Sequence, residues 1–243
     1  MRRLSNIDSS KLDNPSKYYN DGFALLNVKN NSKVISVLNE LLIAEKPKEN
    51  YYWDHSMNSH SLRPDVFSYD NCFLDFLFDN DLPQKLEEYS CRRLTLSHIQ
   101  IVKTDPGRSY QDWHRDTYQF GENPWVGNTP PANKIIFYPV LKDSEPRLKI
   151  IKSSHRCAMN DASIDAQIIN NFENYVLNSD NNQVLMFDTS LLHAVIPDVN
   201  PIGSIRLIYN FITENQYTIK YSSKNHHKIL HDIYEERLKG NAN

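Results

Sequence analysis

The sequence has no long apolar run. Stretches such as Phe23–Leu26 and Leu41–Ala44 are only four residues long, whereas a membrane-spanning helix needs roughly 18 or more. The basic start of the chain, Met1–Ser5, is not followed by an apolar segment of the kind that signal peptides carry. The sequence therefore predicts a cytoplasmic protein that lacks a secretory signal and does not span a membrane.

Cysteine is scarce as well. The three cysteines, Cys72, Cys91 and Cys157, are widely separated and form no Cys-x-x-Cys pair, so we expect reduced thiols and no disulfide framework. Nor does charge of one sign prevail, because 27 basic residues face 30 acidic ones and the net charge is −3. Without a global basic field, nucleic acid is not an expected partner. Nothing in the sequence indicates an oligomeric state.

The first 93 residues are predicted to form a mostly helical cap and support. Between Ser32 and Ala44 the apolar residues recur at the spacing of an amphipathic helix. These residues are Val34, Val37, Leu38, Leu41 and Leu42. The polar segment Lys48–Tyr69 contains His55 and His60, and we expect a loop with solvated imidazoles there, since no further ligand stands at a suitable spacing.

The pattern changes at Arg93. From there to Glu214, short β-branched or aromatic runs are separated by turn residues such as Asp105-Pro106-Gly107. Seven or eight strands follow one another without regularly interleaved helices, which favours an antiparallel barrel or jelly roll over a doubly wound sheet. The predicted fold class is mainly β with flanking helices, a double-stranded β-helix (jelly roll, cupin-like). We expect a single domain over residues 1–243, with its core at 94–214 and a polar, helical tail at 215–243.

The stretch Trp113-His114-Arg115-Asp116 carries two metal-binding side chains. In an extended strand, His114 and Asp116 point to the same face. A third ligand, His193, stands 79 residues after His114 at the start of the predicted strand Leu192–Ile196. Two histidines and one carboxylate on one face form the facial triad of non-haem Fe(II) oxygenases. Three protein ligands also suit catalytic Zn(II), so the triad alone leaves the metal open.

A charged residue on the next predicted strand adds a second signal. Arg206 follows His193 by 13 residues. A guanidinium inside a barrel is costly unless it meets an anion, and it pairs bidentately with a carboxylate. Ser204 lies on the same face of the strand and can add a hydroxyl donor. An acid that chelates the metal at one end and is bound by Arg206 at the other fits this pattern, and 2-oxoglutarate has that shape.

Together these motifs resemble the Fe(II)/2-oxoglutarate-dependent oxygenases, in particular the phytanoyl-CoA dioxygenase-like family. The resemblance is carried by Trp113–Asp116, by Val184–Asp188 leading to His193, and by Ser204–Arg206, and it covers about residues 94–214. It implies the jelly-roll fold that the strand pattern also favours.

Two connections depart from the family pattern. Leu148–Arg156 is similar to a segment that usually ends in Gly-Ser-His, but Ser153 stands in place of the glycine. The turn Ser144–Pro146 also lacks an expected glycine. Both departures concern the geometry of loops between strands more than the metal site.

The resemblance implies ligands for iron and for a cosubstrate. By position, His114, Asp116 and His193 would bind Fe(II), and Arg206, Ser204 and Tyr138 would lie at 2-oxoglutarate. The implied reaction consumes O2, converts 2-oxoglutarate into succinate and CO2, and hydroxylates an unactivated C–H bond. Halogenating relatives have a small residue in place of the carboxylate, so Asp116 implies hydroxylation, desaturation or cyclisation instead of halogenation.

Two other functions fit the same residues. A jelly-roll binding protein that is non-catalytic or holds another metal would keep the ligands without the reaction. A protein-modifying oxygenase of the JmjC type would also use the triad. Those enzymes usually bind 2-oxoglutarate through a lysine on another strand, however, so Arg206 argues against that class.

The segment after the triad, Thr117–Asn133, is polar and aromatic. It suggests a polar small-molecule substrate more than a fatty acyl chain. The residues expected to line the substrate pocket are Tyr110, Trp113, Arg115, Tyr118 and Trp125. Arg115 should point away from the metal, and with Arg108 it is a candidate partner for an anionic group. The histidines not expected to be ligands are His155, His226, His227 and His231.

Overall fold

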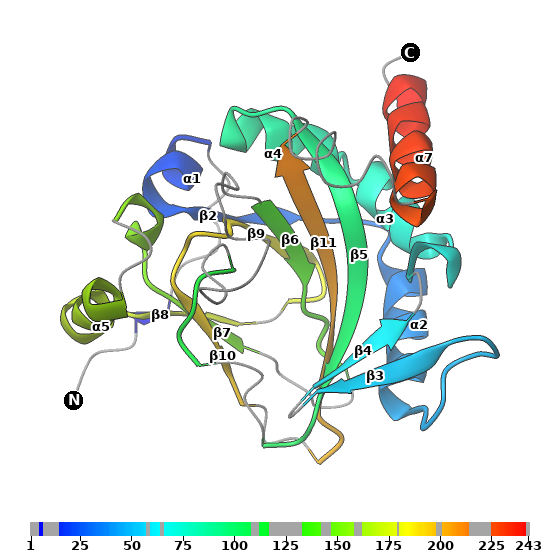
Figure 1. Ribbon diagram of the computed structural model, residues 1–243, viewed down its shortest axis with the longest axis horizontal. Helices are drawn as coiled ribbons and strands as arrows, with labels where there is room; N and C mark the ends of the chain where they lie inside the picture. Colours follow the sequence, from blue (N-terminus) through cyan, green and yellow to red (C-terminus); the bar gives the residue numbers. More distant parts are fainter. Residues whose placement is uncertain are drawn as a thin grey trace.

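The computed structural model describes eleven segments of the chain. They are residues 5–6, 15–56, 59–63, 66–107, 112–116, 133–141, 147–157, 162–178, 180–197, 201–213 and 225–241. Within these segments the chain forms two β-sheets flanked by helices (Figure 1).

The larger sheet has seven strands in the order β2-β9-β6-β11-β5-β4-β3, and every neighbouring pair is antiparallel. The strands are β2 (Phe23–Asn27), β3 (Tyr52–Ser56), β4 (Ser59–Arg63), β5 (Leu94–Thr104), β6 (Asn133–Phe137), β9 (Gln183–Asp188) and β11 (Ser204–Thr213). The two longest, β5 and β11, pair along their whole length except for a bulge at Ser97, where the register shifts between Asn210 and Phe211.

The smaller sheet has four strands in the order β1-β8-β7-β10. They are β1 (Ser5–Asn6), β7 (Arg147–Ile150), β8 (Tyr175–Asn178) and β10 (His193–Ile196). Buried side chains from both sheets share one apolar cluster, in which Leu148 and Leu177 meet Ile136, Leu185 and Ile208. The two sheets therefore pack face to face around a common interior, and the prediction of a double-stranded β-helix is confirmed.

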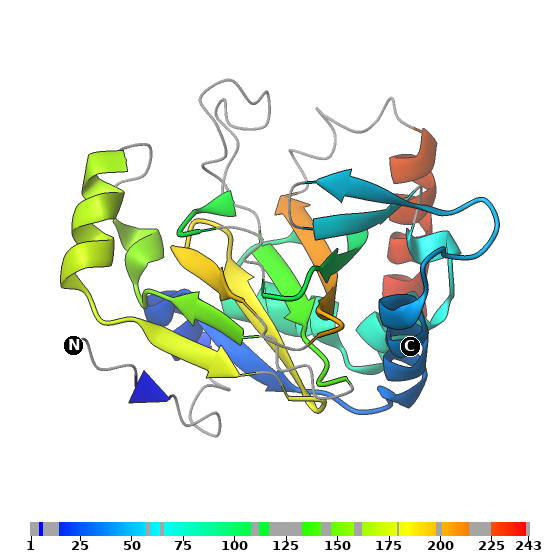
Figure 2. The same cartoon turned by 90° about the horizontal axis from the view of Figure 1, so that it is seen from below.

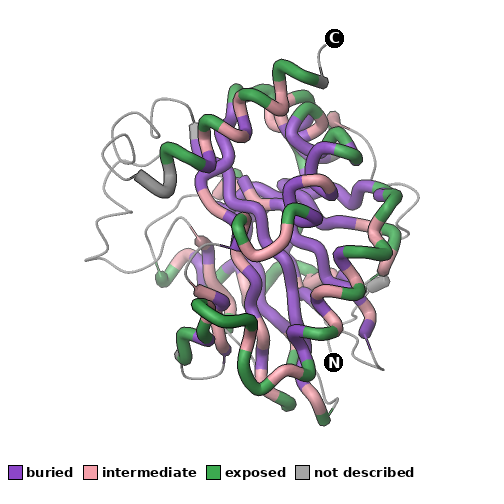
Figure 3. Tube along the Cα trace, turned by 90° about the vertical axis from the view of Figure 1, so that its right-hand side faces the viewer, coloured by how far each residue is buried: buried purple, intermediate pink, exposed green. Residues whose placement is uncertain are grey.

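The other face of the larger sheet is covered by helices, and Figure 1 shows most of them to the right of β5. They are α2 (Ser32–Ile43), α3 (Cys72–Asp79), α4 (Leu82–Ser90) and α7 (Asn225–Asn241). Side chains such as Ile101, Leu207 and Phe137 point to these helices and are fully buried. The Tyr209 hydroxyl also donates to the backbone carbonyl of Phe73 on α3, at 2.6 Å. Buried residues accordingly concentrate on the central strands, and exposed ones on the outer helices and turns (Figure 3).

Four further helical segments complete the described chain. They are α1 (Pro15–Asp21), the 3-10 turn η2 (Val66–Ser68), the 3-10 turn η4 (Ser154–Arg156) and α5 (Ala162–Asn171). Figure 2 shows α5 and α7 at opposite ends of the molecule, with the strands between them. A small apolar cluster of Ile151, Ile168 and Leu192 joins α5 to the segment that precedes β10.

The segment before residue 94 contributes strands as well as helices. The expected loop with solvated histidines is instead the hairpin β3–β4, which forms the edge of the larger sheet and pairs with β5 through β4. His55 and His60 lie opposite each other with their Nδ1 atoms 2.7 Å apart, and Nε2 of His60 lies 2.8 Å from Asp105. The loop prediction was wrong because a polar edge hairpin shows little apolar alternation, and the hairpin's contacts with β5 are not visible in the local sequence.

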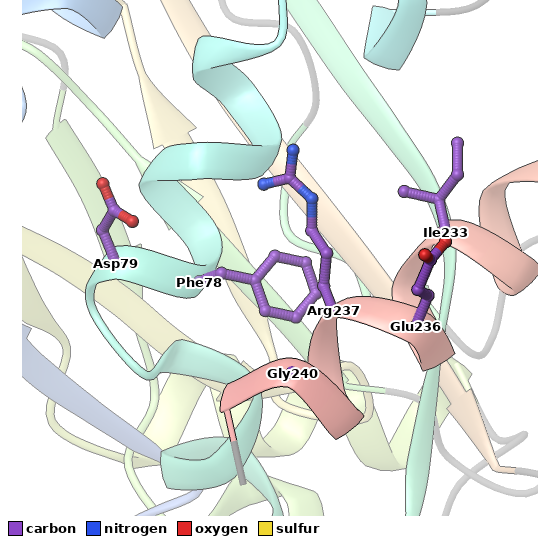
Figure 4. A pocket seen from close by; sticks show the side chains of 6 residues that line it. All are labelled: Phe78, Asp79, Ile233, Glu236, Arg237 and Gly240. Atoms are coloured by element: carbon purple, nitrogen blue, oxygen red, sulfur yellow. The ribbon is translucent and has the colours of Figure 1, made fainter. Parts of the chain in front are cut away.

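No helix in the described segments is both long and apolar enough to cross a membrane. A surface hollow of about 560 Å³ lies between α3 and α7. In Figure 4 the side chain of Arg237 lies beside the ring of Phe78. The guanidinium carbon of Arg237 is 5.7 Å from the centroid of that ring. Arg237 also pairs with Asp75 at 2.7 Å. These contacts tie α7 to α3, and we assign the hollow no chemistry.

Candidate metal centre

Two segments that are far apart in sequence meet at the candidate metal centre. The backbone N–H of His114 donates to the carbonyl of His193, and the N–H of His193 donates to the carbonyl of His114, both at 3.0 Å. The N–H of Asp116 donates to the carbonyl of Thr189 at 2.8 Å. This backbone pairing adds the segment of His114 to the smaller sheet beside β10 and brings the three side chains together.

Hydrogen bonds orient both imidazole rings. Nδ1 of His114 lies 2.7 Å from the carbonyl oxygen of Asp112, and Nδ1 of His193 lies 2.8 Å from that of Leu191. Because a carbonyl only accepts, each Nδ1 carries the proton and each Nε2 is left with its lone pair for a metal. Burial lowers the pKa of both imidazoles, to about 3 for His193. Both rings are therefore neutral near pH 7, as metal binding requires.

Asp116 completes the group. Its Oδ2 lies 3.5 Å from Nε2 of His193, and its Oδ1 lies 3.8 Å from Nε2 of His114. Lys134, on β6, donates to Oδ1 at 2.8 Å. Burial by itself raises the pKa of Asp116. The ammonium of Lys134 and the two imidazoles lower this pKa by more than burial raises it, so the pKa falls below its ordinary value. Asp116 is therefore ionised near pH 7.

The three side chains fit a divalent cation. One ligand atom from each lies within 4.8 Å of the other two. Oδ2 of Asp116 is buried and has no hydrogen-bond partner among the described residues, which is costly for a carboxylate oxygen unless a cation or water satisfies it. Two neutral imidazoles and a carboxylate suit Fe(II), and they also suit Zn(II).

Arg206 lies in the interior between the sheets and is only 4% exposed. Its Nη1 donates to Oγ1 of Thr104 at 3.3 Å. Leu207 pairs with Phe137, which puts Tyr138 beside Arg206 across the sheet. Burial raises the pKa of Tyr138, while the charge of Arg206 opposes that rise. An arginine, a tyrosine and a threonine therefore gather on the inner face.

The start of β11 is fixed by a close backbone approach. Ser204, two residues before Arg206, is buried and on the same face of the strand. Gly203 precedes it with φ of +75°, and a Cβ there would lie 2.1 Å from the carbonyl oxygen of Thr104. Only glycine lets the chain pass so close to β5, which brings Arg206 within reach of its threonine partner.

The other two residues of the motif face away from the metal centre. Arg115 is fully buried and donates from Nη2 to Oδ1 of Asp165 on α5, at 2.8 Å. It also donates to the carbonyl oxygens of Ser154 and Ser190. Trp113 packs against the apolar cluster beside α5. These contacts argue against the assignment of Trp113 and Arg115 to the substrate pocket, because alternate side chains take opposite faces here. Arg115 does point away from the metal, as expected.

The remaining candidates divide into two groups. Tyr110, Tyr118, Trp125 and Arg108 lie outside the described residues, as do the side chains of His226 and His227. His155 is described, and its Nε2 lies 3.1 Å from the carbonyl oxygen of Tyr19. Its ring also packs close to Gly22. His155 therefore holds a turn near α1 and is not part of the metal centre.

Sequence reasoning missed two residues of this region. Lys134 reaches Asp116 from β6, and Thr104 reaches Arg206 from β5. A signal for Lys134 existed, because it stands four residues before Tyr138 and alternate residues share one face of a strand. Thr104 gives no such signal, since its role depends on the pairing of β5 with β11.

The chain was compared with known families, sequences and structures. No family model and no curated protein sequence matches it. Three similar solved structures share its fold at low identity. SnoK, an α-ketoglutarate (2-oxoglutarate) dependent carbocyclase from nogalamycin biosynthesis, has a TM-score of 0.64 at 9% identity, over 86% of this chain and 87% of its own. EctD from S. alaskensis, with 2-oxoglutarate and 5-hydroxyectoine, has a TM-score of 0.60 at 14% identity, over 88% of this chain and 80% of its own. HygX from Streptomyces hygroscopicus, with nickel and 2-oxoglutarate, has a TM-score of 0.59 at 12% identity, over 81% of this chain and 85% of its own.

Identities of 9 to 14% establish the fold and leave the phytanoyl-CoA dioxygenase-like subfamily a prediction. By their own descriptions, HygX holds nickel and 2-oxoglutarate, and EctD holds 2-oxoglutarate. The His114–Asp116–His193 group of this chain fits such a metal. The chain therefore has the double-stranded β-helix fold of the iron- and 2-oxoglutarate-dependent oxygenases.

Proposed function

We propose that the protein is an Fe(II)- and 2-oxoglutarate-dependent oxygenase that hydroxylates a C–H bond of a polar small molecule. The observation that carries the proposal is the grouping of two neutral imidazoles and an ionised carboxylate whose Oδ2 is buried without a partner among the described residues. Arg206 supports it, because a buried guanidinium on the same interior face suits the distal carboxylate of 2-oxoglutarate.

Each residue has a defined part in the proposed reaction. His114, Asp116 and His193 hold the metal on one side, which leaves positions open for ligands. Arg206 binds the carboxylate of 2-oxoglutarate that is remote from the metal, with Ser204 as a further donor and Tyr138 packed beside the cosubstrate. When bound, Fe(II) supplies the oxidising chemistry that couples conversion of 2-oxoglutarate to succinate and CO2 with oxidation of the substrate by O2.

The outcome of the reaction depends on Asp116. A carboxylate at this position occupies a metal site that halide would need, so we propose hydroxylation and not halogenation. The structural neighbours include a carbocyclase and an epimerase. The mass of the product distinguishes hydroxylation from cyclisation, desaturation and epimerisation. Hydroxylation adds one oxygen atom, cyclisation or desaturation removes two hydrogen atoms, and epimerisation leaves the mass unchanged.

Anaerobic spectroscopy tests the proposal. Fe(II) and 2-oxoglutarate are added without oxygen, and the weak visible metal-to-ligand charge-transfer band is recorded. Oxygen is then admitted and succinate is measured. We expect a band and succinate with the unaltered protein, and neither with His193→Ala. His60→Ala serves as the matched control, because His60 lies on the β3–β4 hairpin, outside the metal group.

Two results would contradict the proposal. The first is the absence of a band with the unaltered protein. The second is a band that His193→Ala leaves unchanged. A band without any succinate, even with a broad set of added substrates, would instead favour a binding protein that keeps the ligands but not the reaction.

A further inference from the structure

We propose that the substrate carries a carboxylate or phosphate group, which Lys134 binds beside the metal with help from a row of polar side chains. This inference rests on the proposed function and narrows its substrate class to small anions. The row consists of Lys134 on β6, Asn210 on β11, and Gln100 and His98 on β5.

The strand register places these side chains together. Lys134 pairs with Asn210, and Asn210 pairs with His98 across β11 and β5. Strands lie about 4.8 Å apart, so a row over three strands spans roughly 10 Å. The amide nitrogen of Asn210 donates to Oε1 of Gln100 at 3.2 Å, which joins Gln100 to the row.

The row faces the interior between the sheets. Residues two positions away on the same strands, Ile136, Ile208 and Val102, belong to the interior apolar cluster. Alternate residues share a face, so the polar row continues that inner face toward the metal. The bulge at Ser97 lies beside His98, and bulges commonly re-aim side chains next to active sites. An inner face that turns from apolar to polar indicates a place where a polar molecule is bound.

Lys134 connects the row to the metal centre. Its ammonium lies 2.8 Å from Oδ1 of Asp116, and its side chain is 18% exposed. Arg206 lies four residues from Asn210 along β11, about 13 Å at the usual rise of a strand. A 2-oxoglutarate molecule held by Arg206 would therefore have its distal carboxylate about four residues along β11 from Asn210, which leaves the row for a second molecule.

The charges of the loaded site support an anionic substrate. The two positive charges of Fe(II) and that of Arg206 balance the negative charges of Asp116 and the two carboxylates of 2-oxoglutarate. Both histidines count as neutral, because an imidazole binds a metal through the lone pair of its neutral form. Lys134, which contacts Asp116 and is 18% exposed, then leaves this set of groups with one net positive charge. A carboxylate or phosphate on the substrate balances this charge. Because Lys134 lies next to the metal group, the carbon that is oxidised would be only a few bonds from the anionic group of the substrate.

A panel of matched compounds tests the inference. L-proline and L-lysine are compared with their α-carboxamides, and glucose 6-phosphate is compared with glucose. Binding is read anaerobically from the change in the charge-transfer band. It is read independently from the melting temperature of the Zn(II)-loaded protein, which needs no turnover. We expect the members that carry the carboxylate or phosphate to bind at least tenfold more tightly than the partners that lack it, and the preferred pair to show whether carboxylate or phosphate is recognised.

Three variants locate the effect. Lys134→Met should remove the preference for anions, and Asn210→Ala should weaken anion binding without touching a metal ligand. Lys103→Met is the control, because Lys103 lies on β5 next to Val102, on the opposite face of the strand. In all three variants we expect the affinity for 2-oxoglutarate to stay within twofold of the unaltered protein.

Several results overturn the inference. One is a panel in which the members without a carboxylate or phosphate bind as well as those with it, or in which no member binds in either assay. Another is a tenfold loss of 2-oxoglutarate affinity in Lys134→Met, which would assign the lysine to the cosubstrate. These results differ from a failure of the proposed function, in which the unaltered protein forms no charge-transfer band at all.

Discussion

The two faces of the seven-stranded sheet differ in composition, although the same strands form both. The face toward the helices carries side chains such as Ile101, Leu207 and Phe137, and nearly all of them are apolar and fully buried. The face toward the smaller sheet carries Arg206 and Lys134 beside its apolar residues. Residues that stabilise the fold and residues placed for chemistry are thus adjacent along the chain and separated by the thickness of one strand.

The same alternation governs the metal-binding segment. His114 and Asp116 point inward, while Arg115 between them points outward to Asp165 on α5. One outward residue anchors the segment, and its two inward neighbours are the candidate metal ligands. We therefore expect neighbouring substitutions to have separate consequences, one for the stability of the fold and the other for ligand binding.

The largest effect is expected for Arg115→Met. This change leaves the buried carboxylate of Asp165 without its partner, which costs about 4 kcal/mol of unfolding free energy. Denaturant titration measures it. The double variant Arg115→Met/Asp165→Leu should recover at least about 1 kcal/mol, because it removes the unpaired charge. A single variant within 1 kcal/mol of the unaltered protein would show that the pair does not anchor the segment.

A smaller effect is expected for Leu207→Ala on the outer face. Leu207 is fully buried in the cluster beneath the helices, and its truncation should lower the unfolding free energy by about 3 kcal/mol. The dissociation constant for 2-oxoglutarate, measured anaerobically at a temperature where the variant is folded, should stay within twofold. A large change in that constant would mean that the two faces are not independent.

Arg206→Leu, one residue earlier on β11, should show the opposite pattern. Loss of a charge-assisted bidentate pair is expected to weaken 2-oxoglutarate binding about 100-fold, equivalent to about 2.8 kcal/mol. The unfolding free energy of the ligand-free protein should not fall, since the change replaces a buried charge with an apolar side chain. Arg206→Lys keeps the charge without the planar donor pair and should give an intermediate affinity. Unchanged affinity in Arg206→Leu would place the cosubstrate elsewhere.

Much of this arrangement can be predicted from the sequence because strands have a short period. Alternating apolar residues predict β11 with its observed bounds, Ser204–Thr213, and they put Ser204 and Arg206 on one face. The grouping of His114 and Asp116 follows from the same two-residue spacing. His193 required a further assumption, namely that strands 79 residues apart become neighbours, and the backbone bridge between His114 and His193 has that geometry.

The parts that escaped prediction depend on partners distant in sequence. Asp165 stands 50 residues after Arg115, and no local pattern links the two. Lys134 acquires its position only when β6 pairs with β11. The hairpin β3–β4 is polar on its exposed side, so its sequence resembles a loop until β5 provides an edge to pair with. Local periodicity identifies strands and faces, whereas these contacts arise from how strands are ordered in the sheet.

The backbone bridge between His114 and His193 has a consequence for how the protein loses and regains its metal ion. In small zinc-dependent domains the ion and the fold are gained and lost together. Here the two mutual hydrogen bonds of the bridge use only peptide groups, so the ligand nitrogens remain in position when no ion is present. We therefore expect the protein to release and regain its metal without unfolding. After exposure to a chelator, fresh Fe(II) should restore the loaded metal centre within the time that the ion takes to bind.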